Sequence, residues 1–527
     1  MTGPSVVIGS RVEHDGHRGT VMWVGEVPPA KGTWYGVDWD DSSRGKHDGS
    51  HNGVKYFDTT HPTSGSFVRP AKVNSGVTFE TAVRGRYQND TTIESEVTEQ
   101  LQREINARFV EVVGMEKIGK KQSVLEELGT AVLTGWNIWG TDETDLMALL
   151  PKLHSVEVSY CLLPSWTSVA EITRQLPSLR FLNISGNKLK IPDDPEELKE
   201  SLCHVVNLVL NNMVGYSWQD LLTCCSMFPQ LRNLQVAFNK LEHLGPVPSG
   251  LFDSLEELDI GVNPLTSWEE LCHLGSLPRL ESLNVNNCSL KSVTFPSNAA
   301  TDKTPLFPHL KKLMLSSNPL DMWECTGELN KLASLEYLVI GGEQKNFPYF
   351  QEFTYARIEN LKIFNRTLLS PKEKRDCELF YLKSFSAEYY AAGGTEEDPD
   401  ESNLSAEFKA KHPTYLRLVK AHGAPLDESR YKIQKTQKLK DLKVEMKIAI
   451  PSEPERGEIL KTFLPTTKLA KVKMMLKRHL KLNPSINLTL SFRTTSEGKV
   501  FNIPLDNDQH DLAFYSVGSG DTLVVSW

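Results

Sequence analysis

The sequence predicts a multidomain protein that joins a small antiparallel β-barrel, an α/β solenoid of repeats and a C-terminal α/β domain. Three observations lead to this fold class. The chain has 527 residues, and domains of about 100–200 residues each imply two to four of them. A leucine pattern recurs through the middle of the chain. Residues 6–73 and 438–527 lack that pattern and show the alternation of short strands instead.

The composition is that of an ordinary folded protein. Lysine and arginine total 58 and aspartate and glutamate total 67, so the formal net charge is −9. This balance does not favour nucleic acid as a partner. No stretch approaches the ~20 apolar residues that a membrane span needs, and the first residues lack a basic region followed by an apolar run. We therefore expect a cytoplasmic protein without membrane or nucleic-acid partners.

The eight cysteines form neither C-x-x-C pairs nor a dense disulfide scaffold, so we expect them to be reduced and mostly buried. Tetrahedral zinc needs four convergent ligands. Neither His47 with His51 nor Cys203 with His204 supplies them, and no metal is expected. The adjacent Cys224 and Cys225 are the candidates for a nucleophile in an alternative, enzymatic hypothesis. No compact Cys/His signature accompanies them, and no GxxxxGK[ST] loop occurs, so we expect neither an enzyme nor a bound cofactor.

The middle of the chain repeats the pattern L-x-x-L-x-L-x-x-N/C-x-L from Leu153 to Leu361, as in Leu179 to Leu189. Successive copies begin 23 to 30 residues apart, within or next to the period of leucine-rich repeats. The first positions are Leu153, Leu179, Val205, Leu231, Leu255, Leu280, Leu310, Leu335 and Ile358. Alternate leucines of each short strand should point into the core.

The turn after each strand carries an asparagine or cysteine that should bond the backbone of the neighbouring turn. These residues are Asn187, Asn239, Asn263 and Asn318, with Cys161 and Cys288 in the same position. Segments such as Ser267 to Leu280 have helical apolar spacing and should form the convex side.

The exposed strand positions should form a concave face, and curved arrays of repeats bind folded partners on that face. Its candidate contact residues are Phe181, Glu257, Asp259, Lys312 and Tyr337. A plain solvated face is the alternative.

A helical stretch from Ser370 to Tyr390 should cap the repeats, and the acidic segment Gly393 to Asn403 should be a solvated loop. From about Leu439 the order is strand, strand, helix, strand, strand, strand, which resembles the ubiquitin-like β-grasp. Its helix carries Lys473, Lys477 and Arg478. We interpret them as a docking patch for an acidic partner, with a solvated helix face as the alternative.

Residues 6–73 are rich in glycine, β-branched residues and aromatics and predict a small antiparallel barrel. The loop Gly45 to Gly49, with Trp34 and Gly36 before it and the Phe-x-Arg-Pro of Phe67 to Pro70 after it, resembles the CAP-Gly domain. CAP-Gly domains bind acidic C-terminal tails that end in an aromatic residue, as on α-tubulin. One departure from the family is His47, which stands where the family has asparagine.

The resemblance implies which side chains hold such a tail. The residues are Trp34, Lys46, His47, Asp48, Gly49, Phe67 and Arg69. Lysine and arginine offer charge-assisted bonds to carboxylates, glycine permits a close backbone approach, and two rings can form a slot for the terminal aromatic. In the alternative interpretation, Trp34, Tyr56 and Phe67 are simply core side chains.

The three parts together resemble the tubulin-folding cofactor E family, and the resemblance includes the segment His412 to Pro425. It implies a chaperone that binds α-tubulin. With cofactors B, C and D, such a chaperone assembles and dissociates the αβ-tubulin dimer and so regulates microtubule organisation near the cytoskeleton. A microtubule-associated CAP-Gly adaptor without chaperone activity is the alternative.

We expect five regions along the chain. They are a CAP-Gly domain (1–78), a connecting segment with the repeat N-cap (79–149), leucine-rich repeats (150–365), a helical C-cap with an acidic linker (366–437) and a ubiquitin-like domain (438–527).

Overall fold

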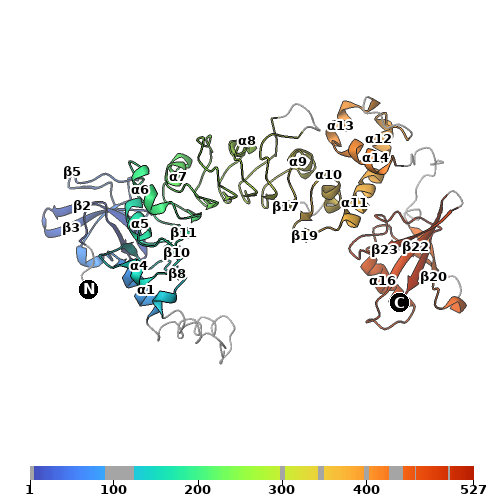
Figure 1. The fold of residues 1–527 in the computed structure, drawn as a ribbon, viewed down its shortest axis with the longest axis horizontal. Helices are drawn as coiled ribbons and strands as arrows, with labels where there is room; N and C mark the ends of the chain where they lie inside the picture. The colour runs from blue at the N-terminus through green and yellow to red at the C-terminus, as the bar shows by residue number, and fades with distance from the viewer. Residues whose placement is uncertain are drawn as a thin grey trace. The chain divides into compact units, whose positions relative to one another are not determined.

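The computed structural model describes residues 5–88, 124–296, 303–341, 349–396, 403–425, 443–456, 459–496 and 499–527. They belong to two compact units, Met1–Ser370 and Pro371–Trp527. The N-terminal unit holds a small barrel and the long row of repeats, and the C-terminal unit holds a helical bundle and a second sheet (Figure 1).

The N-terminal barrel is a four-stranded antiparallel sheet in the order β1-β2-β3-β6. Its strands are β1 (Arg11–His14), β2 (His17–Val27), β3 (Ala30–Trp39) and β6 (Gly65–Val68). A small hairpin of β4 (Ser50–His51) and β5 (Val54–Lys55) lies in the loop between β3 and β6. Val12, Val21, Val37, Trp39 and Val68 form the core, as β-branched residues on alternating positions should. The predicted antiparallel fold is confirmed.

The repeats form one eleven-stranded sheet in which β8 and β10 to β18 pair in parallel and β19 closes the end antiparallel. Most strands have three residues, and the middle one is a buried leucine in β11 to β17 because it alone points into the core. The strands are β8 (Thr130–Val132), β10 (Ser155–Glu157), β11 (Phe181–Asn183), β12 (Asn207–Val209), β13 (Asn233–Gln235), β14 (Glu257–Asp259), β15 (Ser282–Asn284), β16 (Lys312–Met314), β17 (Tyr337–Val339), β18 (Ile363–Phe364) and β19 (Thr367–Leu368). The predicted solenoid is confirmed.

Short helices return the chain between strands, and serine caps begin three of them. The hydroxyls of Ser165, Ser217 and Ser267 accept backbone N–H groups in the first turn of α5, α7 and α8. The helix expected across Ser267 to Leu280 is too long, because α8 ends at Cys272 and Gly275 and Pro278 follow. The helices are α4 (Leu146–Leu149), α5 (Trp166–Thr173), α6 (Glu196–Leu202), α7 (Trp218–Cys225), α8 (Trp268–Cys272), α9 (Met322–Leu329) and α10 (Phe350–Arg357).

The asparagine ladder joins each turn to the next. Asn263 donates to the carbonyls of Val236 and Ile260 at 3.1 and 2.7 Å and accepts the N–H groups of Asn239 and Leu241. Asn187, Asn239 and Asn318 bond in the same manner. The Cys161 thiol donates a hydrogen bond to the carbonyl of Leu133 at 3.6 Å. At this position a cysteine thiol thus takes the place of the asparagine amide. The predicted ladder is confirmed.

The eighth position of every repeat from Leu153 to Leu310 adopts a left-handed backbone, with φ between 53° and 68°. Glycine and asparagine suit this conformation, whereas bulky and β-branched residues adopt it at a cost. The residues are Tyr160, Gly186, Asn212, Phe238, Val262, Asn287 and Ser317.

The sheet begins with β8, ahead of the predicted repeat boundary at residue 150. Leu128, Ala131 and Leu133 are all buried and have the spacing of the first three apolar positions of a repeat. Because alanine replaces leucine at the second of these positions, the pattern is hard to recognise in the sequence. Strand β8 thus lies in the region 79–149, where we expected the connecting segment and the repeat N-cap.

Helix α1 (Phe79–Tyr87) covers the start of the solenoid, and the Tyr87 hydroxyl accepts the N–H of Val132 at 2.8 Å. Strand β7 (Val77–Thr78) pairs in parallel with β9 (Ile138–Gly140). The predicted connecting segment is thus ordered at both ends, and its centre, 89–123, lies outside the described residues.

The C-terminal unit begins with four helices around an aromatic centre. Tyr381, Tyr389 and Tyr415 are fully buried there, and the Tyr381 hydroxyl lies 2.7 Å from Nδ1 of His412. The helices are α11 (Pro371–Ser384), α12 (Ser386–Ala391), α13 (Ala406–Lys411) and α14 (Tyr415–His422). The expected acidic loop falls mostly outside the described residues, since 397–402 do.

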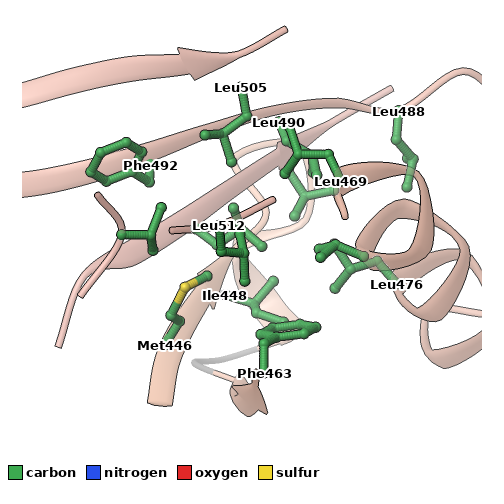
Figure 2. Packing of buried hydrophobic residues seen from close by; sticks show 14 of the residues in the cluster. Met446, Ile448, Phe463, Leu469, Leu476, Leu488, Leu490, Phe492, Leu505 and Leu512 are labelled. Atoms are coloured by element: carbon green, nitrogen blue, oxygen red, sulfur yellow. The ribbon is translucent and has the colours of Figure 1, made fainter. Parts of the chain in front are cut away.

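The second sheet has the order β21-β20-β24-β22-β23, with β20 and β24 parallel at its centre. Figure 2 shows Leu469 and Leu476 of the helix packed over Ile448 and Leu490 of the sheet. This is the predicted β-grasp. The elements are β20 (Val444–Ala449), β21 (Ile459–Phe463), α16 (Leu469–His479), β22 (Thr489–Ser496), β23 (Lys499–Leu505) and β24 (Thr522–Ser526). Three 3₁₀ turns, Pro70–Lys72, Leu125–Glu127 and Pro454–Arg456, complete the description.

Candidate protein-binding surfaces

A groove of about 550 Å³ crosses the barrel between the start of β3, the loop Gly45 to Gly49 and the end of β6. Four cations face it, and no carboxylate is among its lining residues. Low-dielectric walls with charge of one sign attract ligands of the opposite sign. The lining residues are His14, Val27, Ala30, Trp34, Arg44, Lys46, His47, His51, Ser66, Phe67, Val68, Arg69 and Lys72.

The floor of this groove is aromatic. The Phe67 ring stacks on His47 at 5.0 Å between centroids, and it meets the edges of Tyr56 and Phe57 at 5.3 and 5.5 Å. Phe67, Tyr56 and Trp34 are only half-buried, while Phe57 and Trp39 are in the core. The alternative, in which the first three are core side chains, therefore does not hold.

Arg69 lies flat against Trp34, with its guanidinium carbon 3.8 Å from the indole centroid. It also donates to the carbonyl of Thr33 at 3.3 Å. The indole Nε1 of Trp34 is buried and has no hydrogen-bond partner. This face of Trp34 is thus covered, and the aromatic surface open to a ligand is that of Phe67 and His47.

Backbone bonds hold the loop Gly45 to Gly49 against β6. The Lys46 N–H donates to the carbonyl of Gly65 at 2.7 Å, and the Gly65 N–H donates to the carbonyl of His47 at 2.8 Å. Gly49 has φ +91°, and a Cβ there would lie 1.9 Å from the carbonyl oxygen of Phe57. Only glycine fits this position, which explains the loop sequence locally.

His47 is a neutral acceptor within the loop. Its Nδ1 accepts the N–H of Gly49 at 3.0 Å. Burial lowers the pKa of His47, nearby Asp48 opposes this shift and His51 adds to it. Protonation of the ring would add a proton at Nδ1, and this proton would point at the N–H of Gly49. The loop geometry therefore requires the neutral ring.

The structure brings five of the seven predicted tail-binding residues together at the groove, namely Trp34, Lys46, His47, Phe67 and Arg69. Asp48 and Gly49 do not line it. The Asp48 carboxylate instead accepts the N–H of Ser50 at 3.1 Å and lies 3.6 Å from Lys55 Nζ, so it shapes the turn.

Eight lining residues of the groove were not predicted, and four of these have basic side chains: His14, Arg44, His51 and Lys72. The signal for Arg44 and Lys72 is their position, each within three residues of a predicted cation. No local pattern could have indicated His14, because it comes from β1 and reaches the groove only in the folded barrel.

The concave face of the repeats consists of two parallel rows of side chains. Phe181, Glu257, Lys312 and Tyr337 lie in the first row, because their strands pair in register. Asp259 lies in the second row and accepts an N–H from Asn284 at 2.9 Å. The Lys312 ammonium lies over the Tyr337 ring at 5.4 Å. The predicted residues thus share one surface, with an acidic centre and an aromatic residue at either side.

The predicted docking patch on α16 is less open than its sequence indicates. Lys473 pairs with Asp508 at 2.5 Å, and the Lys477 ammonium donates to the carbonyl of Pro484 at 2.8 Å. Arg478 is exposed and has no ion pair among the described residues.

The paired thiols lack the properties of a nucleophile. Cys224 and Cys225 are both buried. Burial raises the pKa of Cys224 to about 12 and that of Cys225 well above its ordinary value. Within the described part of the chain, no group of three or more histidine, cysteine or acidic side chains could hold a metal ion. In that same part, no helix is long and apolar enough to cross a membrane.

A cationic groove, a row of leucine-rich repeats and a β-grasp domain in one chain define a modular protein of three kinds of domain. Two family models agree with its first two parts: the CAP-Gly domain matches residues 8–73 and the Leucine Rich Repeat matches residues 178–199. Tubulin-specific chaperone E of Danio rerio is 37% identical over 528 residues and covers 99% of both chains. The Homo sapiens chaperone of the same name is 36% identical, over 99% of this chain and 98% of its own. The chain therefore belongs to the tubulin-specific chaperone E family.

A solved structure is also similar, the solution structure of the C-terminal ubiquitin-like domain of mouse tubulin-specific chaperone E. It is 33% identical, covers 18% of this chain and 94% of its own length, and has a TM-score of 0.15.

Proposed function

We propose that this chain is a tubulin-folding chaperone that captures the acidic C-terminal tail of α-tubulin in the barrel groove. The observation that carries the proposal is the lining of that groove. Four cationic side chains and the half-buried ring of Phe67 line it, and no carboxylate is among its lining residues. An acidic peptide that ends in an aromatic residue matches this lining in charge and in shape.

The groove residues divide the work by chemistry. Lys46 is exposed at the rim, where its ammonium can form a charge-assisted hydrogen bond to a carboxylate. Arg69 is fixed against Trp34, which orients its remaining N–H groups at little cost in entropy. The stacked pair of Phe67 and His47 offers an apolar face to the terminal ring.

The concave face of the repeats is the surface proposed for the folded body of α-tubulin. Both surfaces belong to the N-terminal unit, in which β7 pairs with β9 and so joins the barrel to the first repeat. When the tail is bound, the effective concentration of the tubulin body at the concave face rises. The affinity of the two contacts together therefore exceeds the affinity of either contact alone.

In this proposal the chaperone acts in the cytoplasm with tubulin cofactors B, C and D. It takes part in assembly of the αβ dimer and in its dissociation, and it thereby affects the cytoskeleton. Arg478 of α16 is the part of the predicted docking patch that remains available to such a cofactor. Binding, and not covalent chemistry, performs each of these steps, so no bound cofactor is invoked.

The alternative, a microtubule-associated adaptor, shares the same surfaces but is not favoured, since the full-length relatives are named as chaperones. One experiment separates the two. The purified chain is mixed with αβ-tubulin dimers and with polymerised microtubules, and both dimer dissociation and polymer binding are measured. Dissociation of soluble dimers supports the chaperone, whereas polymer binding with intact dimers supports the adaptor.

A further inference from the structure

We propose that a second groove, between the barrel and the repeats, binds an apolar side chain flanked by carboxylates on the folded body of tubulin. This inference rests on the proposed chaperone function. It adds a client-binding site that is neither the tail groove nor the concave face.

The groove has a volume of about 1280 Å³ and takes one wall from the barrel and the other from the turns of three successive repeats. Val7 and Ile8 contribute from the barrel side, and Phe238 and Lys240 contribute from the repeat side. We call it the junction groove. It shares no lining residue with the tail groove.

Phe238 is the residue that points to a ligand. It occupies the left-handed eighth position, where asparagine stands in two other repeats, and it has φ +62°. A bulky residue adopts this conformation only at a cost in free energy. Its ring is 53% exposed and contacts no other aromatic ring among the described residues. Tyr160 shows the contrast, because it holds the same position with Arg18 at 5.9 Å over its ring and Asn212 bonded to its hydroxyl.

Val7 and Ile8 extend this apolar surface from the barrel side, with 57% and 63% of their areas exposed. Three large hydrophobic side chains of the chain are therefore exposed toward one groove. Singly exposed apolar residues are common, but a cluster within a concavity marks a contact surface. Covering a ring together with two β-branched side chains supplies the apolar part of the binding energy.

The charges at the junction groove determine the sign of its ligand. Its carboxylates are occupied, because Asp40 accepts two bonds from Arg11 and Asp38 accepts from Thr60 and Ser64. Two of its three lysines, Lys190 and Lys240, are exposed. Lys240 has no ion pair within the described residues, and Lys190 pairs only with the exposed Asp193. The rim therefore favours carboxylates around the apolar contact.

The junction groove is a fixed feature of the N-terminal unit. Lys188 of the repeats lies 3.7 Å from Asp40 and 4.0 Å from Asp38 of the barrel. Arg11 also bonds to Asp40, so this cluster joins the two walls through side chains that are largely buried. The ligand thus meets a preformed surface and does not have to assemble it.

The test compares Phe238→Asn with Val262→Asn. Both variants place asparagine at the eighth position of adjacent repeats and relieve a left-handed turn, but Val262 does not line the junction groove. Each full-length chain is titrated with tubulin whose C-terminal tails have been removed and, separately, with a tail peptide. We expect Phe238→Asn to bind tail-less tubulin at least tenfold more weakly and Val262→Asn to match the wild type. Neither variant should change the affinity for the tail peptide.

A charge arm uses Lys240→Glu and, as its control, Lys291→Glu, an exposed lysine of the solenoid outside the junction groove. Lys240→Glu should weaken binding of tail-less tubulin, and this loss should shrink at high salt. Equal binding by Phe238→Asn and wild type would overturn the inference while leaving the proposed function intact. If the wild type binds neither tail-less tubulin nor the tail peptide, the proposed function itself fails. If Phe238→Asn misfolds, the comparison of Lys240→Glu with Lys291→Glu tests the inference by itself.

Discussion

At the scale of single residues, Lys46 should contribute directly to capture of the tail. Loss of one charge-assisted contact costs about 1.5–3 kcal/mol. Lys46→Ala should therefore weaken an acidic, aromatic-ended peptide at least tenfold in calorimetry. Lys55→Ala is the matched control, since Lys55 lies in the same loop region but pairs with Asp48 and Asp58 away from the groove. Equal loss in both variants would indicate general electrostatic attraction and not a specific contact.

His47 should make the stability of the barrel depend on pH. Burial places its folded pKa below 6.5, so the unfolded chain takes up the proton first as pH falls. Above pH 6.5, His47 makes its full contribution to the stability of the folded barrel. This contribution is lost as the pH falls through the lower pKa that His47 has in the folded state. Asp48 and His51 are the charged neighbours that set the size of the effect. His47→Asn should show a smaller loss of thermal stability between neutral and mildly acidic pH. An identical pH profile in both proteins would contradict the role of the His47 ring in the loop.

At the scale of elements, the ladder residues hold adjacent repeats together. Asn263 is 1% exposed and bonds four backbone groups of two neighbouring turns. Asn263→Ala would remove the acceptor of the buried N–H groups of Asn239 and Leu241, and each buried group left unpaired costs about 1–3 kcal/mol. We expect a loss of about 3 kcal/mol or more in denaturant unfolding. Asn233→Ala on the concave face should cost only about 0.5 kcal/mol, as surface changes do. A similar cost at both positions would show that the amide ladder is not the stabilising feature.

At the scale of the whole molecule, the concave face should act on the tubulin body and not on its tail. Glu257 and Asp259 form its acidic centre. Reversal of both to lysine changes exposed or half-buried side chains, and it removes the bonds that Asp259 accepts from Asn284 and from the N–H of Gly261. We expect slower dissociation of tubulin dimers with unchanged affinity for the tail peptide. Glu269→Lys on α8, at the outer side of the same repeat, is the control. If its effect equals that of the double variant, the concave face is not the contact surface.

The sequence predicted the elements that depend on periodic patterns and missed those that depend on a single substitution. Repeats with leucine at both strand positions were found, whereas the strand with Ala131 at its centre was not. The groove residues were predicted where a family motif contains them. The motif does not predict that the Asp48 side chain turns toward Lys55, because the local contacts with Ser50 and Lys55 set its orientation. Likewise, the lysines of α16 gave no sign that Asp508, from a distant loop, neutralises Lys473.

The pairing of β7 with β9 and the cover of α1 over β8 have a consequence for how the chain can be divided. A fragment that starts at residue 150 would begin with β10 as an uncovered edge, with its backbone N–H and C=O groups unpaired. Such edges recruit strands from other molecules and lead to aggregation. Exchange of the barrel between related proteins, by recombination or by design, must therefore carry β8, β9 and α1 with it. The boundary at which this architecture can be cut lies inside the solenoid and not at the end of the barrel.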